Sequence, residues 1–110
     1  MVSHVSATDS LRNERIWQDV LAKRPPFGDT MHIEEYFYPA DTEVPDHTHK
    51  AEQIGYMLEG TMGLTVEGRS YDVQPGDFYW LPASSSHRLT IGTDVRTLLI
   101  TAAPFSAEEH

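Results

Sequence analysis

The chain has 110 residues, no cysteine, and a net charge of −9 from 8 basic and 17 acidic side chains. This length favours one domain with one modest core, and the negative charge argues against nucleic acid or anionic membranes as partners. The lack of cysteine excludes disulfides and thiolate metal ligands. With no apolar run of transmembrane length and no signal-peptide pattern, a cytoplasmic location is expected.

Residues 1–28 are predicted to form an N-terminal arm and a first structural element. Residues 1–10 are small and polar, as expected of a loose arm. The apolar residues within 11–24 fit a short helix imperfectly, and a strand over residues 15–20 fits them equally well. Pro25 and Pro26 end either element, because proline cannot continue the backbone hydrogen bonding.

Residues 29–105 show a pattern that is typical of an all-β domain. Short runs rich in aromatic and β-branched residues alternate with turn residues. The expected strands lie within residues 31–38, 39–45, 47–58, 61–68, 69–73, 77–82, 87–92 and 95–102. The pattern predicts one small antiparallel β-barrel, followed by a tail at residues 106–110.

Three histidines and a glutamine form the pattern with the clearest chemical meaning. In a strand, successive side chains point to opposite faces, so His47, His49 and Gln53 are expected to share one face of a single strand. His87 follows a second extended run after the turn at 75–77. Neutral imidazole is a common ligand of transition metals, so the four residues predict a metal site. The alternative is that the histidines are hydrogen-bonded structural residues.

Residues 41–87 resemble the two sequence motifs of the cupin family. The matching positions in the first motif are His47, His49, Gln53 and Gly60, and those in the second are Gly76, Pro82 and His87. The resemblance implies a jelly-roll-like double-stranded β-helix with one divalent metal, and iron, manganese, nickel, zinc and copper all remain open. It also implies a homodimer.

The chain departs from the cupin motifs at four positions. Asp41 replaces the opening glycine of the first motif, and aspartate tolerates a left-handed backbone better than most residues. Ser84 and Ile91 replace the glycine and the final asparagine of the second motif. Gln53 stands at the usual glutamate position and offers a neutral amide oxygen. We therefore expect a metal shell without negative charge, which binds hard cations less tightly and leaves the ion a stronger Lewis acid.

Strand alternation also suggests which residues line a pocket beside the metal. Gly55 and Met57 continue the face of Gln53, and Gly55 is expected to leave space there. One of two aromatic sets, the first on residues 32–38 and the second on 78–80, is expected to face inward. For each aromatic residue, core packing is the alternative. The pocket-lining candidates are His32, Tyr36, Tyr38, Gly55, Met57, Phe78 and Trp80.

The predicted function is a metal-dependent reaction on a small organic molecule. An iron site with open coordination positions would suit a dioxygenase, and another metal would suit a lyase, isomerase or cyclase that relies on Lewis-acid catalysis. The sequence identifies no catalytic acid or base. A barrel that binds or senses a small molecule without turnover is the competing hypothesis.

Overall fold

The computed structural model describes residues 4–6 and 13–103 of the chain. Every regular element in these residues is a β-strand, so no helix in them could span a membrane. The strands are β1 (Glu14–Trp17), β2 (Val20–Lys23), β3 (Met31–Tyr38), β4 (Glu43–His47), β5 (Gln53–Glu59), β6 (Met62–Val66), β7 (Arg69–Val73), β8 (Phe78–Leu81), β9 (His87–Ile91) and β10 (Val95–Ala102).

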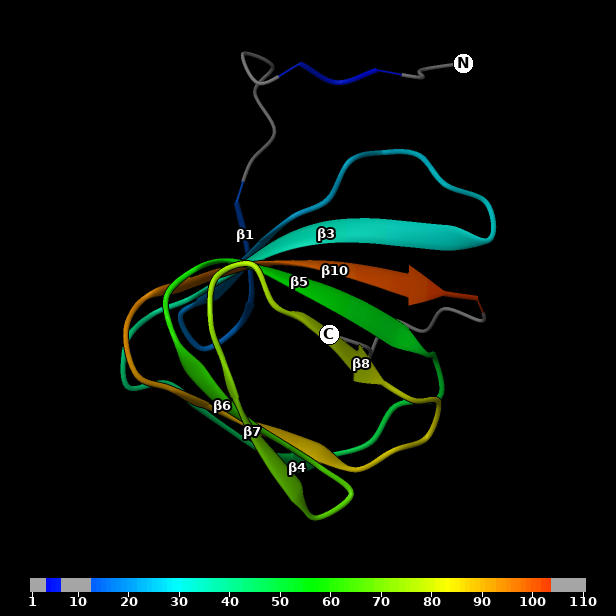
Figure 1. Cartoon of the computed structure of the whole chain (residues 1–110). Coiled ribbons are helices and arrows are strands. Elements are labelled where there is room, and N and C mark those ends of the chain that lie inside the picture. The colour runs from blue at the N-terminus through cyan, green and yellow to red at the C-terminus, as the bar shows by residue number, and fades with distance from the viewer. Residues whose placement is uncertain (1–3, 7–12, 104–110) are drawn as a thin grey trace.

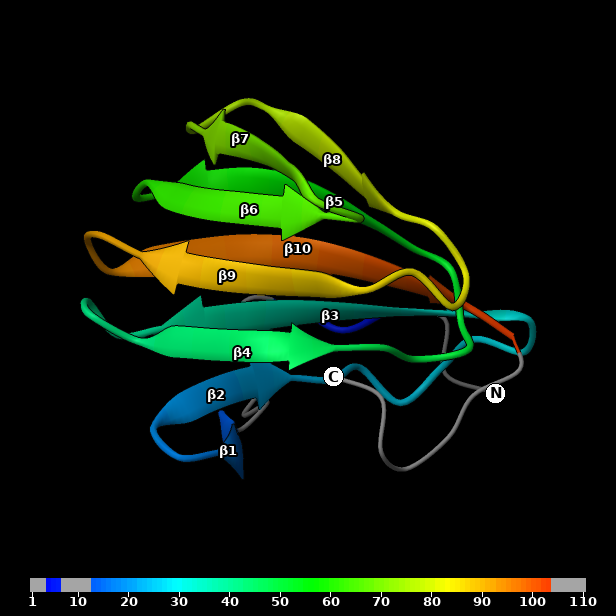
Figure 2. The ribbon, with the colours of Figure 1, turned by 90° about the horizontal axis from the view of Figure 1, so that it is seen from below.

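The strands form two antiparallel sheets that face each other (Figure 1). One sheet has the order β1-β2-β3-β10-β5-β8, and the other has the order β4-β9-β6-β7. Viewed from below, β4, β9 and β6 lie in front of β3, β10 and β5 (Figure 2). This arrangement confirms the predicted all-β barrel.

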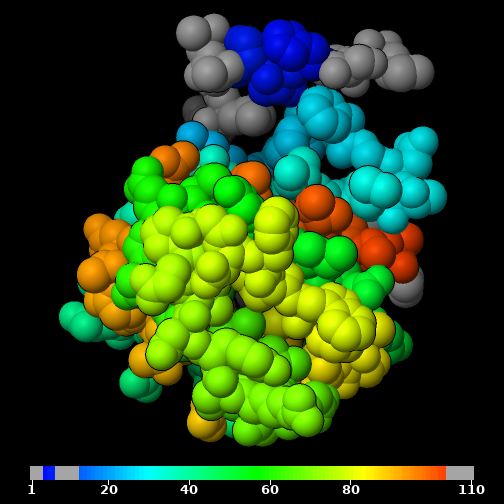
Figure 3. Space-filling model, viewed as in Figure 1, coloured from blue at the N-terminus to red at the C-terminus, as the bar shows by residue number. Residues whose placement is uncertain are grey.

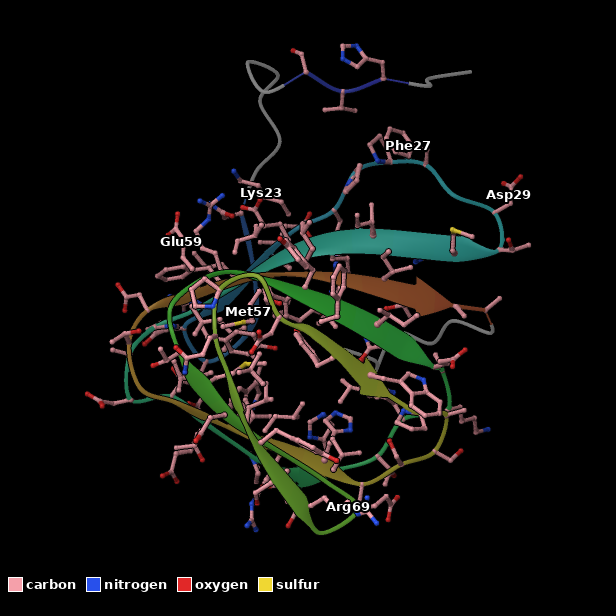
Figure 4. The ribbon with its side chains drawn as sticks, in the orientation of Figure 1. Lys23, Phe27, Asp29, Met57, Glu59 and Arg69 are labelled. Carbon is pink, nitrogen blue, oxygen red and sulfur yellow. The ribbon has the colours of Figure 1, made fainter. Side chains whose placement is uncertain are left out.

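Buried and exposed residues alternate along the strands, which places the core between the sheets. The pattern is clearest in β5, β9 and β10, where every second residue is buried. Met57 is fully buried in this core and points into the space between the sheets (Figure 4). Phe27 and Asp29 lie outside the barrel on the loop before β3 (Figure 4).

The N-terminal element is a hairpin, which corrects both expectations for this segment. Its described residues form β1 and β2, which pair with each other and extend the larger sheet through β3. The break between the strands falls at Gln18, whose φ of 47° is in the left-handed region. A continuous strand cannot pass through this conformation, and a helix would not supply the edge pairing that β3 receives.

The expectation that His47, His49 and Gln53 share one strand is wrong. β4 ends at His47 in the smaller sheet, and β5 begins at Gln53 in the larger sheet. Residues 48–52 cross from one sheet to the other. Alternation along one strand therefore cannot explain how these residues come together. His47 lies in the smaller sheet, Gln53 in the larger sheet, and His49 in the segment that connects them.

Two residues at motif glycine positions adopt the left-handed backbone that glycine favours. Asp41 has a φ of 66°, and its N–H donates to the carbonyl of Ile91 at 3.1 Å. Ser84 has a φ of 59° at the place of the second-motif glycine. The chain thus keeps the backbone conformation of both turns without glycine, although this conformation is sterically unfavourable for residues that have a side chain.

The outer face of the larger sheet carries a continuous apolar row. Pairing places Trp80 beside Ile54, Ile54 beside Ile100, and Ile100 beside Ile33, and all four side chains are exposed. Phe78 is 76% exposed on the same outer face of β8. Of the two aromatic sets, the one on β8 therefore points away from the barrel interior. The homodimer expected from the sequence stays a prediction.

Candidate metal centre

Three histidines meet at one end of the barrel. His47 ends β4, His49 lies in the crossing segment 48–52, and His87 begins β9. One ligand atom from each lies within 4.8 Å of the others. The ring centroids of His47 and His49 lie 4.2 and 4.7 Å from that of His87. The sequence-predicted histidines are therefore clustered, although they come from three separate segments.

A β-bulge in β4 turns His47 toward the interior. On β9, His87 pairs with His47 and Leu89 pairs with Val44, so three steps along β4 match two along β9. The two residues between, Pro45 and Asp46, are both exposed. Regular alternation would put Val44 and His47 on opposite faces, and the extra residue restores them to the same one. Proline fits this position because β4 is an edge strand.

Backbone hydrogen bonds connect the segments that carry the other two histidines. The N–H of Ser84 donates to the carbonyl of His49 at 2.9 Å, which ties the loop before β9 to the crossing segment. The same loop is tied to the β6–β7 turn, because Ser86 N–H donates to Glu67 Oε1 at 2.8 Å. These contacts fix the position of His49 relative to His87.

Each imidazole contacts a backbone carbonyl two residues away through its Nδ1 atom. The distances are 2.9 Å from His47 to Pro45, 2.9 Å from His49 to Ala51, and 3.4 Å from His87 to Ser85. A carbonyl only accepts hydrogen bonds, so Nδ1 must carry the proton in each neutral ring. The three Nε2 atoms are then left with lone pairs, as metal ligands require.

One nitrogen of the cluster is buried without a hydrogen bond. His49 Nε2 is buried and has no hydrogen-bond partner among the described residues. The pKa of His87 is lowered to about 4, mainly by burial and in smaller part by the neighbouring His47 and His49. A histidine cluster with an unsatisfied buried nitrogen fits a divalent transition ion, which would accept the Nε2 lone pairs.

Gln53 is buried on the inward face of β5, where the alternating pattern puts it. Its Nε2 donates to the Thr101 hydroxyl at 2.9 Å on the neighbouring strand β10. This bond fixes the amide nitrogen and leaves the amide oxygen as the atom that can serve an ion.

The pocket-lining candidates fall into different environments. Tyr36 and Tyr38 face the interior and line a pocket of about 330 Å³ that also includes His47. His32 is exposed near the start of β3. Met57 is part of the core. Gly55 is buried, but the ring of Tyr79 fills the space beside it.

Two residues near the site were not singled out from the sequence. Tyr79 faces inward from β8, and its hydroxyl lies 2.7 Å from that of Thr97. Trp17 lines the pocket beside Tyr36 and His47. Because side chains alternate along β8 and Leu81 is buried, Tyr79, two residues earlier, is expected to face inward and Trp80 outward. No local pattern could bring Trp17 to the pocket, since it arrives through the β1–β2 hairpin.

Two facing antiparallel sheets with a histidine cluster at one end define a small β-barrel of the double-stranded β-helix class. The cupin domain family model matches residues 34–102, and the chain therefore belongs to the cupin family. This result confirms the resemblance seen in the sequence. No protein of curated function matches the chain significantly.

Solved structures show the same fold. An RmlC-like cupin from Shewanella frigidimarina is 19% identical with a TM-score of 0.82, over 92% of this chain and 91% of that one. The polyketide cyclase RemF from Streptomyces resistomycificus is 25% identical with a TM-score of 0.78, over 93% and 80%. A salicylate 1,2-dioxygenase from Pseudaminobacter salicylatoxidans is 21% identical with a TM-score of 0.70, over 77% of this chain and 26% of that one.

Proposed function

We propose that the barrel holds one divalent transition metal and is a metal-dependent enzyme that acts on a small organic molecule. The ion would bind Nε2 of His47, His49 and His87, with the amide oxygen of Gln53 as a fourth ligand. The observation that carries this proposal is the common orientation of the three imidazoles. Each Nδ1 contacts a backbone carbonyl, which leaves three Nε2 lone pairs free in one compact cluster, in which His49 and His87 are buried and His47 is half-buried.

A purely structural role for the histidines explains less of this geometry. A structural histidine is expected to satisfy both ring nitrogens when it is buried. His49 is only 8% exposed, and its Nε2 has no partner among the residues that the structure describes. An unpaired buried nitrogen costs about 1–3 kcal/mol. A metal ion at this position would remove that cost.

The residues around the ion suit either of the two predicted reaction classes. When bound, such an ion supplies Lewis-acid polarisation of a ligand oxygen, and iron also supports dioxygen chemistry. Burial raises the pKa of Tyr36, Tyr38 and Tyr79, so these phenols keep their protons near neutral pH. As neutral phenols they can donate hydrogen bonds, but they are weaker acids than an exposed tyrosine and do not act as bases. A cyclase and a dioxygenase among the proteins of similar fold support both classes.

The first experiment is elemental analysis of untagged protein purified without added metal. The unchanged chain is compared with the His47→Ala, His49→Ala double variant and with His32→Ala, which removes an exposed histidine outside the cluster. We expect near-stoichiometric metal in the unchanged chain and in His32→Ala, and its loss in the double variant. Circular dichroism checks that each variant remains folded.

The metal found decides which assay follows. Iron directs attention to oxygen uptake with aromatic and enolic substrates. Zinc, nickel or manganese directs it to cyclisation, elimination and isomerisation. If neither the purified protein nor the protein reconstituted with these metals holds an ion, the proposed function is wrong.

A further inference from the structure

The outer face of the larger sheet exposes large apolar side chains that continue from one strand to the next. The paired row runs from β8 through β5 and β10 to β3, and further residues of β8 and β3 extend it. Figure 3 shows atoms of β10, β5 and β8 side by side on the right of the molecule. We call this surface the apolar face, and it consists of Met31, Ile33, Ile54, Phe78, Trp80 and Ile100. The described part of the chain leaves each of the six between 38% and 76% exposed.

The apolar face is large enough to form most of a dimer interface. Taking about 200 Å² for a large side chain, these exposed fractions amount to roughly 600 Å². That is the upper end of what a monomer usually exposes as one patch, about 300–600 Å². A standard stable interface buries about 800 Å² of each partner. The half-buried Tyr56 and Leu98, which pair with each other beside the row, add to the area.

The charges around the apolar face favour another copy of this chain over a charged partner. At one end, Arg96 contacts Glu35 at 3.0 Å and Glu59 at 2.9 Å, and Lys23 lies 4.0 Å from Glu35. These two cations and two carboxylates cancel. At the other end, Glu52 accepts a hydrogen bond from Trp80 Nε1 at 2.7 Å. The chain as a whole carries a charge of −9, so this nearly neutral face is where two copies repel each other least.

The order of side chains along the row makes the apolar face complementary to itself. Its β8 end is aromatic, with Phe78 and Trp80, and its β3 end is aliphatic, with Met31 and Ile33. A two-fold axis near the middle of the row places the aromatic end of one copy on the aliphatic end of the other. Sheets pack face to face in this way, with their strands about 30° apart.

From these observations we propose that two copies of this chain form a symmetric dimer through their apolar faces. The proposal gives the expected homodimer a specific surface. It goes beyond the proposed function and does not depend on the metal centre, because Ile54 points outward from β5 whereas the neighbouring Gln53 points inward. The rings of Phe78 and Trp80, which are 76% and 58% exposed, would lose the most contact with water.

Sedimentation velocity over a range of protein concentrations tests the dimer. The unchanged chain is compared with Ile100→Lys, in the middle of the apolar face, and with Thr90→Lys, which adds the same charge at an exposed position of β9 in the other sheet. We expect the unchanged chain and Thr90→Lys to dimerise. Ile100→Lys should weaken association on the order of a hundredfold, because a symmetric interface buries the new charge twice.

Tryptophan fluorescence gives a second readout that leaves the apolar face unchanged. The chain has two tryptophans, and Trp17→Phe leaves Trp80 as the reporter. We expect its emission to shift to shorter wavelength as the protein concentration rises, because the indole leaves water when the dimer forms. The same shift should be absent when Ile100→Lys is added. Circular dichroism checks that each variant is folded.

A chain that stays monomeric at the highest concentration overturns the proposal. Equal dimerisation of Ile100→Lys and Thr90→Lys also overturns it, because the interface would then lie elsewhere. If Ile100→Lys does not fold, the emission of Trp80 decides, and a dimer without the shift contradicts the proposal. All measurements are repeated in EDTA with the metal content determined. A dimer in metal-free protein supports the proposal whether or not the metal centre is confirmed.

Discussion

The ring of Tyr79 lies against the backbone of Gly55 on the neighbouring strand. Gly55 pairs with Tyr79 in the β5–β8 ladder, and a Cβ atom at position 55 would overlap the ring. The Tyr79 hydroxyl reaches the Thr97 hydroxyl at 2.7 Å, and Thr97 in turn donates to the carbonyl of Tyr56 at 3.1 Å. The missing side chain at Gly55 therefore accommodates a buried aromatic ring and does not leave an open space beside the histidines.

We expect Gly55→Ala to lower the free energy of unfolding by about 1–3 kcal/mol, because the added methyl group must displace the Tyr79 ring. Urea unfolding followed by circular dichroism measures the change. Gly63→Ala is the matched control in another strand, where a Cβ would make only ordinary contacts, the nearest at 3.7 Å from Thr90. Equal losses in the two variants would contradict the packing described for Tyr79.

Gln53→Glu should have opposite effects with and without metal. In metal-free protein, a buried carboxylate replaces the amide that donates to Thr101, and we expect the free energy of unfolding to fall by about 1–3 kcal/mol. With metal, the charged ligand should tighten binding on the order of tenfold. Isothermal titration with Mn²⁺ or Zn²⁺ and thermal unfolding in EDTA measure the two effects. An unchanged metal affinity would mean that Gln53 does not reach the ion.

Acid should destabilise the metal-free protein through His87. Its folded-state pKa is lowered from 6.5 to about 4, mainly by burial. Between these values the unfolded chain binds a proton at His87 that the folded chain does not, so stability is full above about pH 6.5 and falls as the pH approaches 4. Between these two pH values the free energy of unfolding is expected to fall on the order of 2 kcal/mol.

Urea unfolding at several pH values between 7 and 4, in the presence of EDTA, tests the acid effect. His87→Gln should flatten the dependence, since glutamine does not titrate, whereas His32→Gln should retain it. If the free energy of unfolding depends on pH equally in the unchanged chain and in His87→Gln, then His87 does not cause the loss of stability in acid.

Ser84→Gly should stabilise the fold by about 0.5–1 kcal/mol. The φ of 59° at Ser84 is unfavourable for a residue with a side chain, and glycine removes this steric cost at some expense in chain entropy. Ser86→Gly is the control in the same loop. Ser86 does not have a positive φ, so glycine relieves no strain there and only raises the conformational entropy of the unfolded chain, which destabilises the fold. Urea unfolding of each variant, compared with the unchanged chain, measures the change in the free energy of unfolding. If Ser84→Gly is less stable than the unchanged chain, the strain argument is contradicted.

The sequence by itself determined the all-β class, the cupin family and the identity of the three clustered histidines. Strand alternation and turn residues are local signals, and they suffice to mark short strands such as β5 and β9. The left-handed turn at Asp41 was also predictable, because aspartate tolerates that conformation.

Only the tertiary structure decided how the site is assembled. His47 and Gln53 are six residues apart but belong to different sheets, and the bulge at Pro45 and Asp46 sets the direction of His47. Both features depend on which strands pair and in which register, and that is fixed by contacts between distant segments. The same reason explains why Trp17 lines the pocket while Trp80 faces outward: a period of two defines two faces, and only packing decides which of them is buried.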